Sequence, residues 1–163
     1  MRKLLVLAAA IAAASCGGNS SNLSQAEAQS VASEISAALQ SAEASGQNQF
    51  SLGGTLQPVT KQCDGGGSLT VSGSLSVNCP WGLRSCTTAG SLTVTADQCT
   101  TDTGVIISGS VTATVAGTGF LFTKTVTGSL TITRGEESKT CDVNLMLMLG
   151  HLGGTVCGID VSK

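Results

Sequence analysis

The sequence predicts an α+β fold. One N-terminal amphipathic helix packs on a curved, mostly antiparallel meander sheet of about seven or eight strands, braced by disulfides. Three observations lead to this prediction. Apolar residues recur at intervals of three and four within residues 23–46, the period changes to two across residues 50–163, and six cysteines are spread through that second part. The chain of 163 residues suits one modest core, so we expect helix and sheet to form a single domain.

The predicted helix over residues 23–46 has recognisable ends. Ser24 and Glu27 have capping-box spacing, in which each side chain bonds the backbone amide of the other residue, and Gly46 is a natural stop. The apolar stripe consists of Ala28, Val31, Ile35, Ala38, Leu39 and Ala42. We expect this stripe to cover the sheet, because a helix lying on a membrane would carry more Lys and Arg on its polar face.

The β-rich region alternates apolar residues with Ser and Thr, so each strand should have one apolar face and one hydroxyl face. Residues 64–67, 102–104 and 134–136 have the composition of turns. Residues 143–149 are apolar at nearly every position, which predicts a central strand covered on both faces.

A weak repeat of the form Gly-Ser-apolar-Ser/Thr-apolar or Ala begins at Gly73, Gly90, Gly109 and Gly128. Its spacing fits one hairpin of an antiparallel meander, and it also fits one coil of a parallel β-helix. We favour the meander, because the turns are rich in glycine and aspartate and because a single helix needs a sheet to cover. Glycines within strands would also allow the sheet to bend.

The first residues have the features of an export signal. Arg2 and Lys3 precede an apolar run over residues 4–14, which is too short to cross a bilayer as a helix because about 20 residues are needed. The segment Ala13-Ala14-Ser15-Cys16 resembles the lipobox of bacterial lipoprotein precursors, with Ala13 where leucine is usual. Ordinary signal peptidase cleavage near Ala14 is the alternative.

The resemblance implies a lipoprotein signal peptide over residues 1–15, a diacylglyceryl group and fatty acyl chains such as palmitate on Cys16, and a flexible tether over residues 16–22. It also implies the lipoprotein export machinery as a partner and a membrane anchor through Cys16. Gly17 stands where aspartate would favour the inner membrane, so the family pattern favours the outer membrane.

The number of cysteines favours the lipid anchor over ordinary cleavage. Seven is an odd number, and assigning Cys16 to lipid leaves six cysteines for three disulfides in an oxidising compartment. We prefer pairing between sequence neighbours, although other connectivities remain open. The preferred pairs are Cys63–Cys79, Cys86–Cys99 and Cys141–Cys157.

Composition and motifs argue against several classes of function. Without Arg2 and Lys3 the chain has six basic and ten acidic residues, which argues against a nucleic-acid partner, because binding to phosphates needs clustered Lys and Arg. His151 would need Asp142 or Asp160 beside it to act as a general base, and no nucleophile elbow is present. We therefore expect no enzyme activity and no cofactor.

Neither metal binding nor ligand binding has a strong candidate. Asp97 and Asp102 could share a calcium ion, but their turn composition and the lack of a dense acidic loop lead us to expect no metal. Trp81 could contact a ligand or the bilayer interface, or pack over a disulfide. The ligand therefore stays unknown at this point.

The predicted function is that of a bacterial envelope lipoprotein with a non-catalytic structural or binding role. One alternative is a carrier of apolar or lipid ligands, with a cavity between sheet and helix. Another is a surface-binding or adhesive protein that uses threonine pairs at residues 93 and 95, 112 and 114, and 131 and 133. Such a threonine array resembles the ice-contacting face of antifreeze proteins.

Overall fold

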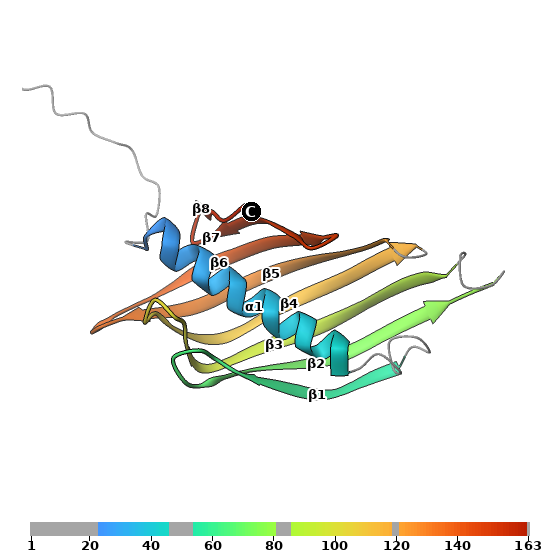
Figure 1. Cartoon of the computed structure of the whole chain (residues 1–163), viewed down its shortest axis with the longest axis horizontal. Coiled ribbons are helices and arrows are strands. Elements are labelled where there is room, and N and C mark those ends of the chain that lie inside the picture. The colour runs from blue at the N-terminus through green and yellow to red at the C-terminus, as the bar shows by residue number, and fades with distance from the viewer. Residues whose placement is uncertain (1–22, 46–53, 81–85, 119–120, 163) are drawn as a thin grey trace, which may run out of the picture.

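The computed structural model describes residues 23–45, 54–80, 86–118 and 121–162. This part of the chain contains one helix and an open sheet of eight strands, in which every strand is antiparallel to its neighbours in sequence order. The elements are α1 (Gln25–Ser45), β1 (Gly54–Gln62), β2 (Ser68–Asn78), β3 (Thr87–Thr100), β4 (Ile106–Thr118), β5 (Leu121–Arg134), β6 (Glu137–Met148), β7 (His151–Val156) and β8 (Ile159–Asp160). α1 lies across one face of the sheet (Figure 1).

The predicted meander is therefore confirmed, and the β-helix alternative is wrong. Turns occupy the positions predicted from composition, between β1 and β2, β3 and β4, and β5 and β6. The β6–β7 turn has positive φ at Leu149 (52°) and Gly150 (83°), and the β7–β8 turn has the same feature at Cys157 (54°) and Gly158 (81°). Two consecutive positive φ angles characterise the type I′ turn, whose twist matches that of antiparallel strands.

The helix begins with the predicted capping box. The Ser24 amide donates to Glu27 Oε2 at 2.7 Å, and the Glu27 amide donates to Ser24 Oγ at 3.3 Å. The predicted apolar stripe is buried against the sheet, with each member at most 1 % exposed. Four alanines contribute to the buried surface of α1, at positions 28, 32, 38 and 42. Their small side chains let the helix backbone lie close to the strands.

Packing between strands explains the first two glycines of the repeat. Gly73 lies opposite Leu92, and Gly90 lies opposite Leu75. A β-carbon at Gly73 would come within 2.3 Å of the Ser91 carbonyl oxygen, and the backbone there has a φ of 145°. Gly73 and Gly90 therefore mark positions where β2 and β3 approach too closely for a side chain, whereas at Gly109 and Gly128 the nearest contacts of a β-carbon would be 3.6 and 3.2 Å, and their positive φ angles of 111° and 145° are what favour glycine.

Ion pairs join α1 to the sheet at both ends and near its middle. Glu27 Oε1 lies 3.1 Å from Arg134 Nε, Glu34 Oε2 lies 2.6 Å from Lys61 Nζ, and Glu43 pairs with Lys124. These are all the acidic residues of the helix. Arg134 and Lys124 lie near opposite ends of β5, so the pairs fix the direction in which the helix crosses the sheet.

The prediction of a doubly covered strand over residues 143–149 is wrong. Val143, Leu145 and Leu147 point into the core, whereas Met146, Met148 and Leu149 are exposed. α1 covers only one face of the sheet, so the alternate side chains of β6 remain in solvent. No helix in the described part of the chain is both long and apolar enough to span a membrane.

Two of the three preferred cysteine pairs are wrong. The structure joins Cys63 to Cys99 and Cys79 to Cys86, in place of Cys63–Cys79 and Cys86–Cys99. Cys63 and Cys79 flank the 11-residue strand β2, so they lie at opposite ends of an element more than about 30 Å long, whereas disulfides need Cα atoms within about 7 Å. The same reason excludes Cys86–Cys99, because Cys86 directly precedes β3 and Cys99 lies near its far end.

Cys141–Cys157 is present as preferred, because these cysteines flank a hairpin. The turn between β6 and β7 reverses the chain, so the two strands run side by side and bring Cys141 close to Cys157. Cys63 reaches Cys99 because the β1–β2 turn folds against the end of β3. There the Gly65 amide donates to the Thr100 carbonyl at 2.9 Å.

The bridges should differ in their contribution to stability. Cys63–Cys99 spans 36 residues and Cys79–Cys86 spans 7, so their removal should lower the free energy of unfolding by about 4 and about 2.5 kcal/mol, respectively. Urea unfolding of the two double Cys→Ala variants measures this order. Equal losses, or non-reduced peptide maps that give Cys63–Cys79, would contradict the structure.

The capping box should make stability depend on pH. Hydrogen bonds from the amide and hydroxyl of Ser24 hold the pKa of Glu27 below its ordinary value, and the charge of Arg134 adds to this effect. A lowered pKa means that the ionised carboxylate stabilises the fold at neutral pH, and that this contribution disappears as the pH falls through the folded-state pKa.

We therefore expect Glu27→Gln to destabilise the protein at pH 7 and to approach the wild type in stability near pH 3. Ser24→Ala should cost about 1 kcal/mol at pH 7. Urea unfolding at both pH values measures these effects, with Glu136→Gln in the β5–β6 turn as the control. A Glu27→Gln deficit that grew with acidity would show that the sign is wrong.

Candidate binding surface

The face of the sheet opposite α1 is lined by Ser and Thr. We call it the hydroxyl face. It comprises the alternate side chains of the strands that do not enter the core. The register aligns Ser72, Thr93, Thr112, Thr127 and Asn144 in one row across β2 to β6. A neighbouring row contains Thr60, Thr70, Thr95, Ser110, Ser129 and Asp142. The threonine pairs predicted from sequence thus fall on one face, although Thr131 lies opposite Ser108, in a further row.

The hydroxyl face forms a two-dimensional grid. Neighbouring strands are about 4.8 Å apart, and alternate residues along a strand are about 6.6 Å apart. Some hydroxyl groups bond across strands: the Oγ1 atoms of Thr60 and Thr70 are 2.9 Å apart, and those of Thr131 and Thr140 are 3.2 Å apart. Each hydroxyl combines one donor with two acceptor sites, so such pairs retain capacity to bind water or a polar ligand.

Charge is distributed unequally between the two faces. Lys61, Lys124 and Arg134 pair with acidic residues of α1, and Lys139 shares its strand face with the core-facing residues of β6. Within the described ranges, the hydroxyl face therefore carries no Lys or Arg. Asp142 lies on this face and accepts a 2.8 Å hydrogen bond from Ser129 Oγ. This surface can form hydrogen bonds but offers nothing to attract a polyanion.

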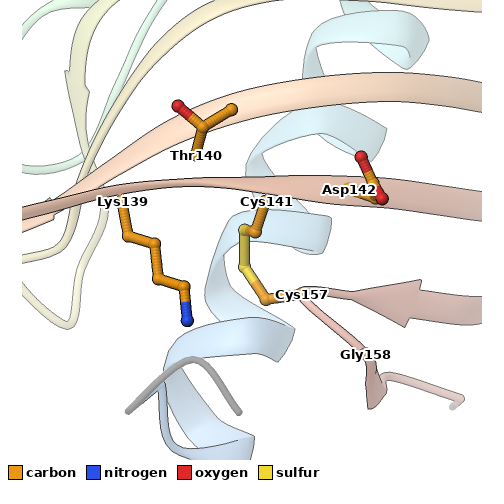
Figure 2. A pocket seen from close by; sticks show the side chains of 6 residues that line it. All are labelled: Lys139, Thr140, Cys141, Asp142, Cys157 and Gly158. Carbon is orange, nitrogen blue, oxygen red and sulfur yellow. A yellow bond between two sulfur atoms is a disulfide. The ribbon is translucent and has the colours of Figure 1, made fainter. Parts of the chain in front are cut away.

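A cavity of about 310 Å³ lies beside the Cys141–Cys157 disulfide (Figure 2). It forms where β7 stops and leaves the beginning of β6 paired with β5 on one side only. Lys139, Thr140, Asp142 and Gly158 complete its lining. The cavity is open and of mixed polarity, and the bridge beside it ties the β7–β8 edge to β6.

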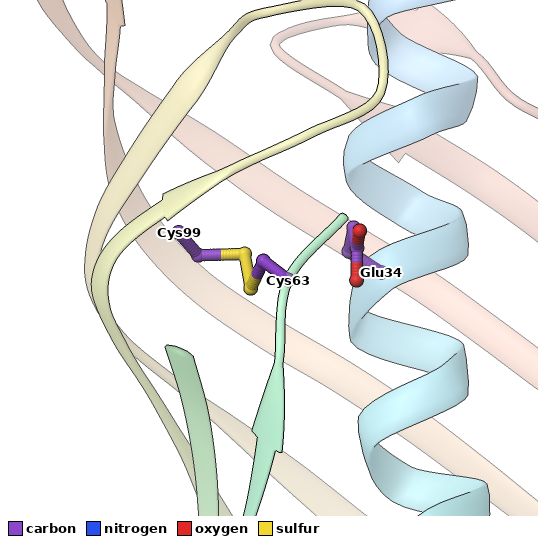
Figure 3. Close-up of side chains that lie close together, drawn as sticks. All are labelled: Glu34, Cys63 and Cys99. Atoms are coloured by element: carbon purple, nitrogen blue, oxygen red, sulfur yellow. A yellow bond between two sulfur atoms is a disulfide. The ribbon is translucent and has the colours of Figure 1, made fainter. Parts of the chain in front are cut away.

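Glu34 lies close to the sulfur atoms of Cys63 and Cys99 (Figure 3). Three such groups can hold a metal ion when the cysteines are thiolates, but here the two sulfurs are bonded to each other. The carboxylate already accepts bonds from Lys61 Nζ at 2.6 Å and from the Asp64 amide at 3.2 Å. This arrangement satisfies a buried charge, and its role is to hold α1 against the β1–β2 turn.

The structure separates His151 from its proposed carboxylate partners. His151 lies opposite Met148, whereas Asp142 lies six residues further back along β6, about 20 Å away. Asp160 lies opposite Thr155 and accepts bonds from the amide and the hydroxyl of Ser162. The elements of a histidine–carboxylate site are therefore not brought together.

The remaining predicted residues have local partners or lie outside the described residues. Asp97 lies opposite Ser68 at the end of β2, and Asp102 accepts a hydrogen bond from Ser30 of α1, so the two aspartates contact different elements. Cys16 and Trp81 lie outside the described ranges.

Sequence reasoning missed two features of the surface. The first is the set of helix–sheet ion pairs, whose partners are far apart along the chain. The second is a group of exposed apolar side chains at one end of the sheet, which includes Leu121, Met148 and Leu149. The uninterrupted apolar composition of residues 145–149 is the available signal, but from sequence alone it indicates burial.

Comparisons with known protein families, with curated proteins and with solved structures found no match to this chain.

Proposed function

We propose that this chain is a bacterial envelope lipoprotein, anchored through Cys16, whose domain acts as a non-catalytic binding or structural module. The cysteine count carries the proposal. The chain has seven cysteines, and six of them form three disulfides, which leaves Cys16 over. A remaining cysteine directly after an export segment is the residue that lipoprotein processing modifies.

The order of segments supports this proposal. A signal peptide over residues 1–15 would be removed, and residues 16–22 would connect the acylated cysteine to the helix that begins at Gln25. Disulfides favour an oxidising compartment outside the cytoplasm. Gly17 in place of aspartate supports sorting to the outer membrane.

The packing of α1 argues against the alternative of a lipid carrier. The apolar stripe of the helix is almost completely buried in direct contact with the sheet. The cavity between Ser30, Glu34 and Lys61 holds about 190 Å³, is open and has walls of mixed polarity. A carrier needs an enclosed apolar cavity several times the volume of a side chain. We propose that α1 is an amphipathic helix on a curved sheet, with the interface between helix and sheet filled by packed side chains.

The hydroxyl face supports a second candidate function, namely binding to an uncharged, hydroxyl-rich surface. Its aligned rows offer many weak donors and acceptors at regular spacing, and its lack of cations disfavours polyanions. In an envelope location, the accessible polymer of this chemistry is the glycan of the cell wall. Binding would then be multivalent, with no single residue dominant.

The lipid anchor predicts a specific chemical result. The mature protein should incorporate labelled palmitate, and its intact mass should include fatty acyl groups on a chain that begins at Cys16. Cys16→Ser should abolish the labelling and release the protein from membranes. A secreted product with an unmodified amine at another residue would refute the anchor.

The hydroxyl-face hypothesis predicts an effect on binding without an effect on folding. Replacing Thr93, Thr112 and Thr127 by valine removes three aligned hydroxyl groups while keeping the side-chain shape, and each change should alter stability by at most about 0.5 kcal/mol. Sedimentation with isolated cell-wall sacculi should be clearly weakened in this variant. The matched triple Thr→Ser variant should keep it. Equal sedimentation of the valine and wild-type proteins would rule out this role.

A further inference from the structure

We propose that one end of the sheet inserts into the surface of a lipid bilayer. The inserted part consists of Leu121, Phe122, Met148 and Leu149, and we call it the apolar tip. These side chains are 63 %, 39 %, 49 % and 65 % exposed, respectively. The inference rests on the proposed function, because the lipid anchor is what brings a bilayer within reach.

The apolar tip is assembled by strand pairing. β5 begins at Leu121 and β6 ends at Met148, and the antiparallel register places Thr123 opposite Met148. The beginning of β5 and the end of β6 therefore lie at the same end of the sheet, remote from the first turn of α1 (Figure 1). Met146 extends the apolar surface two residues further along the hydroxyl face.

The distribution of these side chains identifies the kind of partner. Leu121 and Met148 belong to the hydroxyl face, whereas Phe122 shares the α1 side of β5 with Lys124. The tip is therefore apolar on both faces of the sheet. A folded protein docked on one face would leave the other face exposed, whereas a fluid hydrocarbon surface can surround both.

The backbone at the tip supports a role beyond folding. Leu149 occupies the first position of the type I′ turn with a φ of 52°, where asparagine, aspartate or glycine is favoured. A leucine there is both conformationally unfavourable and exposed, so it contributes little to the stability of the isolated domain. An apolar side chain projecting from a turn is suited to penetrate a bilayer surface.

The charges around the tip are compatible with insertion. Thr118 and Thr123 are polar but uncharged, and Lys124 is already paired with Glu43. His151 lies opposite Met148 at the margin. Among the described residues, this composition favours neither anionic nor cationic lipids, so neutral phosphatidylcholine should be sufficient.

The anchor and the tip can reach the same bilayer. A seven-residue tether spans at most about 24 Å, and the 21-residue helix α1 is about 31 Å long. Glu43 near the end of α1 pairs with Lys124, three residues after Leu121, so the tip lies about one helix length from the start of α1. A domain lying with α1 along the membrane would be held at both ends.

The test uses the full lipidated protein with Trp81→Phe and a reporter, Phe122→Trp, reconstituted into phosphatidylcholine vesicles with brominated acyl chains. Bromine quenches tryptophan only at hydrocarbon depth, so the expected result is a blue-shifted emission that is strongly quenched. A control with Thr112→Trp as the reporter, in the middle of the hydroxyl face, should stay unquenched. Quenching at both positions would mean that the whole hydroxyl face lies on the lipid, and it would overturn the proposal that only the apolar tip inserts.

Leu149→Asn separates binding from folding. Asn-Gly is favoured in a type I′ turn, so the variant should unfold at the same or a higher temperature while quenching of the Phe122→Trp reporter is largely lost. Undiminished quenching in this variant would overturn the proposed role of Leu149. If the Phe122→Trp protein floats with vesicles but stays unquenched, insertion of the apolar tip is disproved while the lipid anchor stands. If it fails to float, the lipid anchor is disproved, and with it the inference.

Discussion

The packing of one helix against one face of the sheet is the constraint on which the rest of this structure depends. An open sheet with an apolar face is stable in water only when that face is covered. The chain has three phenylalanines and one tryptophan, so its core is built from Val, Leu, Ile and Ala. Close approach of α1 through its alanines compensates for the small side chains. Ion pairs from Glu27 and Glu43 to opposite ends of β5 then fix the helix direction.

A single covering helix also determines the chemistry of the opposite face. With every acidic residue of α1 paired to a cation on the sheet, the described basic residues lie on the helix side. The opposite face must stay soluble without them, and Ser and Thr do so because they tolerate strand conformation and bind water. The disulfides act at the margins: Cys63–Cys99 holds the β1–β2 turn against β3, and Cys141–Cys157 holds the β7–β8 edge against β6.

Local periodicity was enough to predict the helix, its cap and the meander, because each of these depends on residues close together in sequence. The disulfides show the limit of that reasoning. Cys63 and Cys79 are near in sequence but lie at opposite ends of β2, and only the register shows that Cys99 is the nearer partner. The pairing of Glu27 with Arg134 likewise needs the sheet before it can be seen. For residues 143–149, composition could not show that a single helix would leave Met146 and Met148 in solvent.

The edges of the sheet bear on which part of the surface can bind a partner. Open sheets can associate through unpaired edge strands, and this one limits that route. β1 carries Pro58 within an irregular register between Leu56 and Val59, and β8 is only two residues long. Edge-to-edge association is therefore disfavoured, and the hydroxyl face is too polar for tight apolar packing. Of the described surface, the end of β5 and β6 is where several large apolar side chains remain accessible, so attraction to lipid is concentrated there.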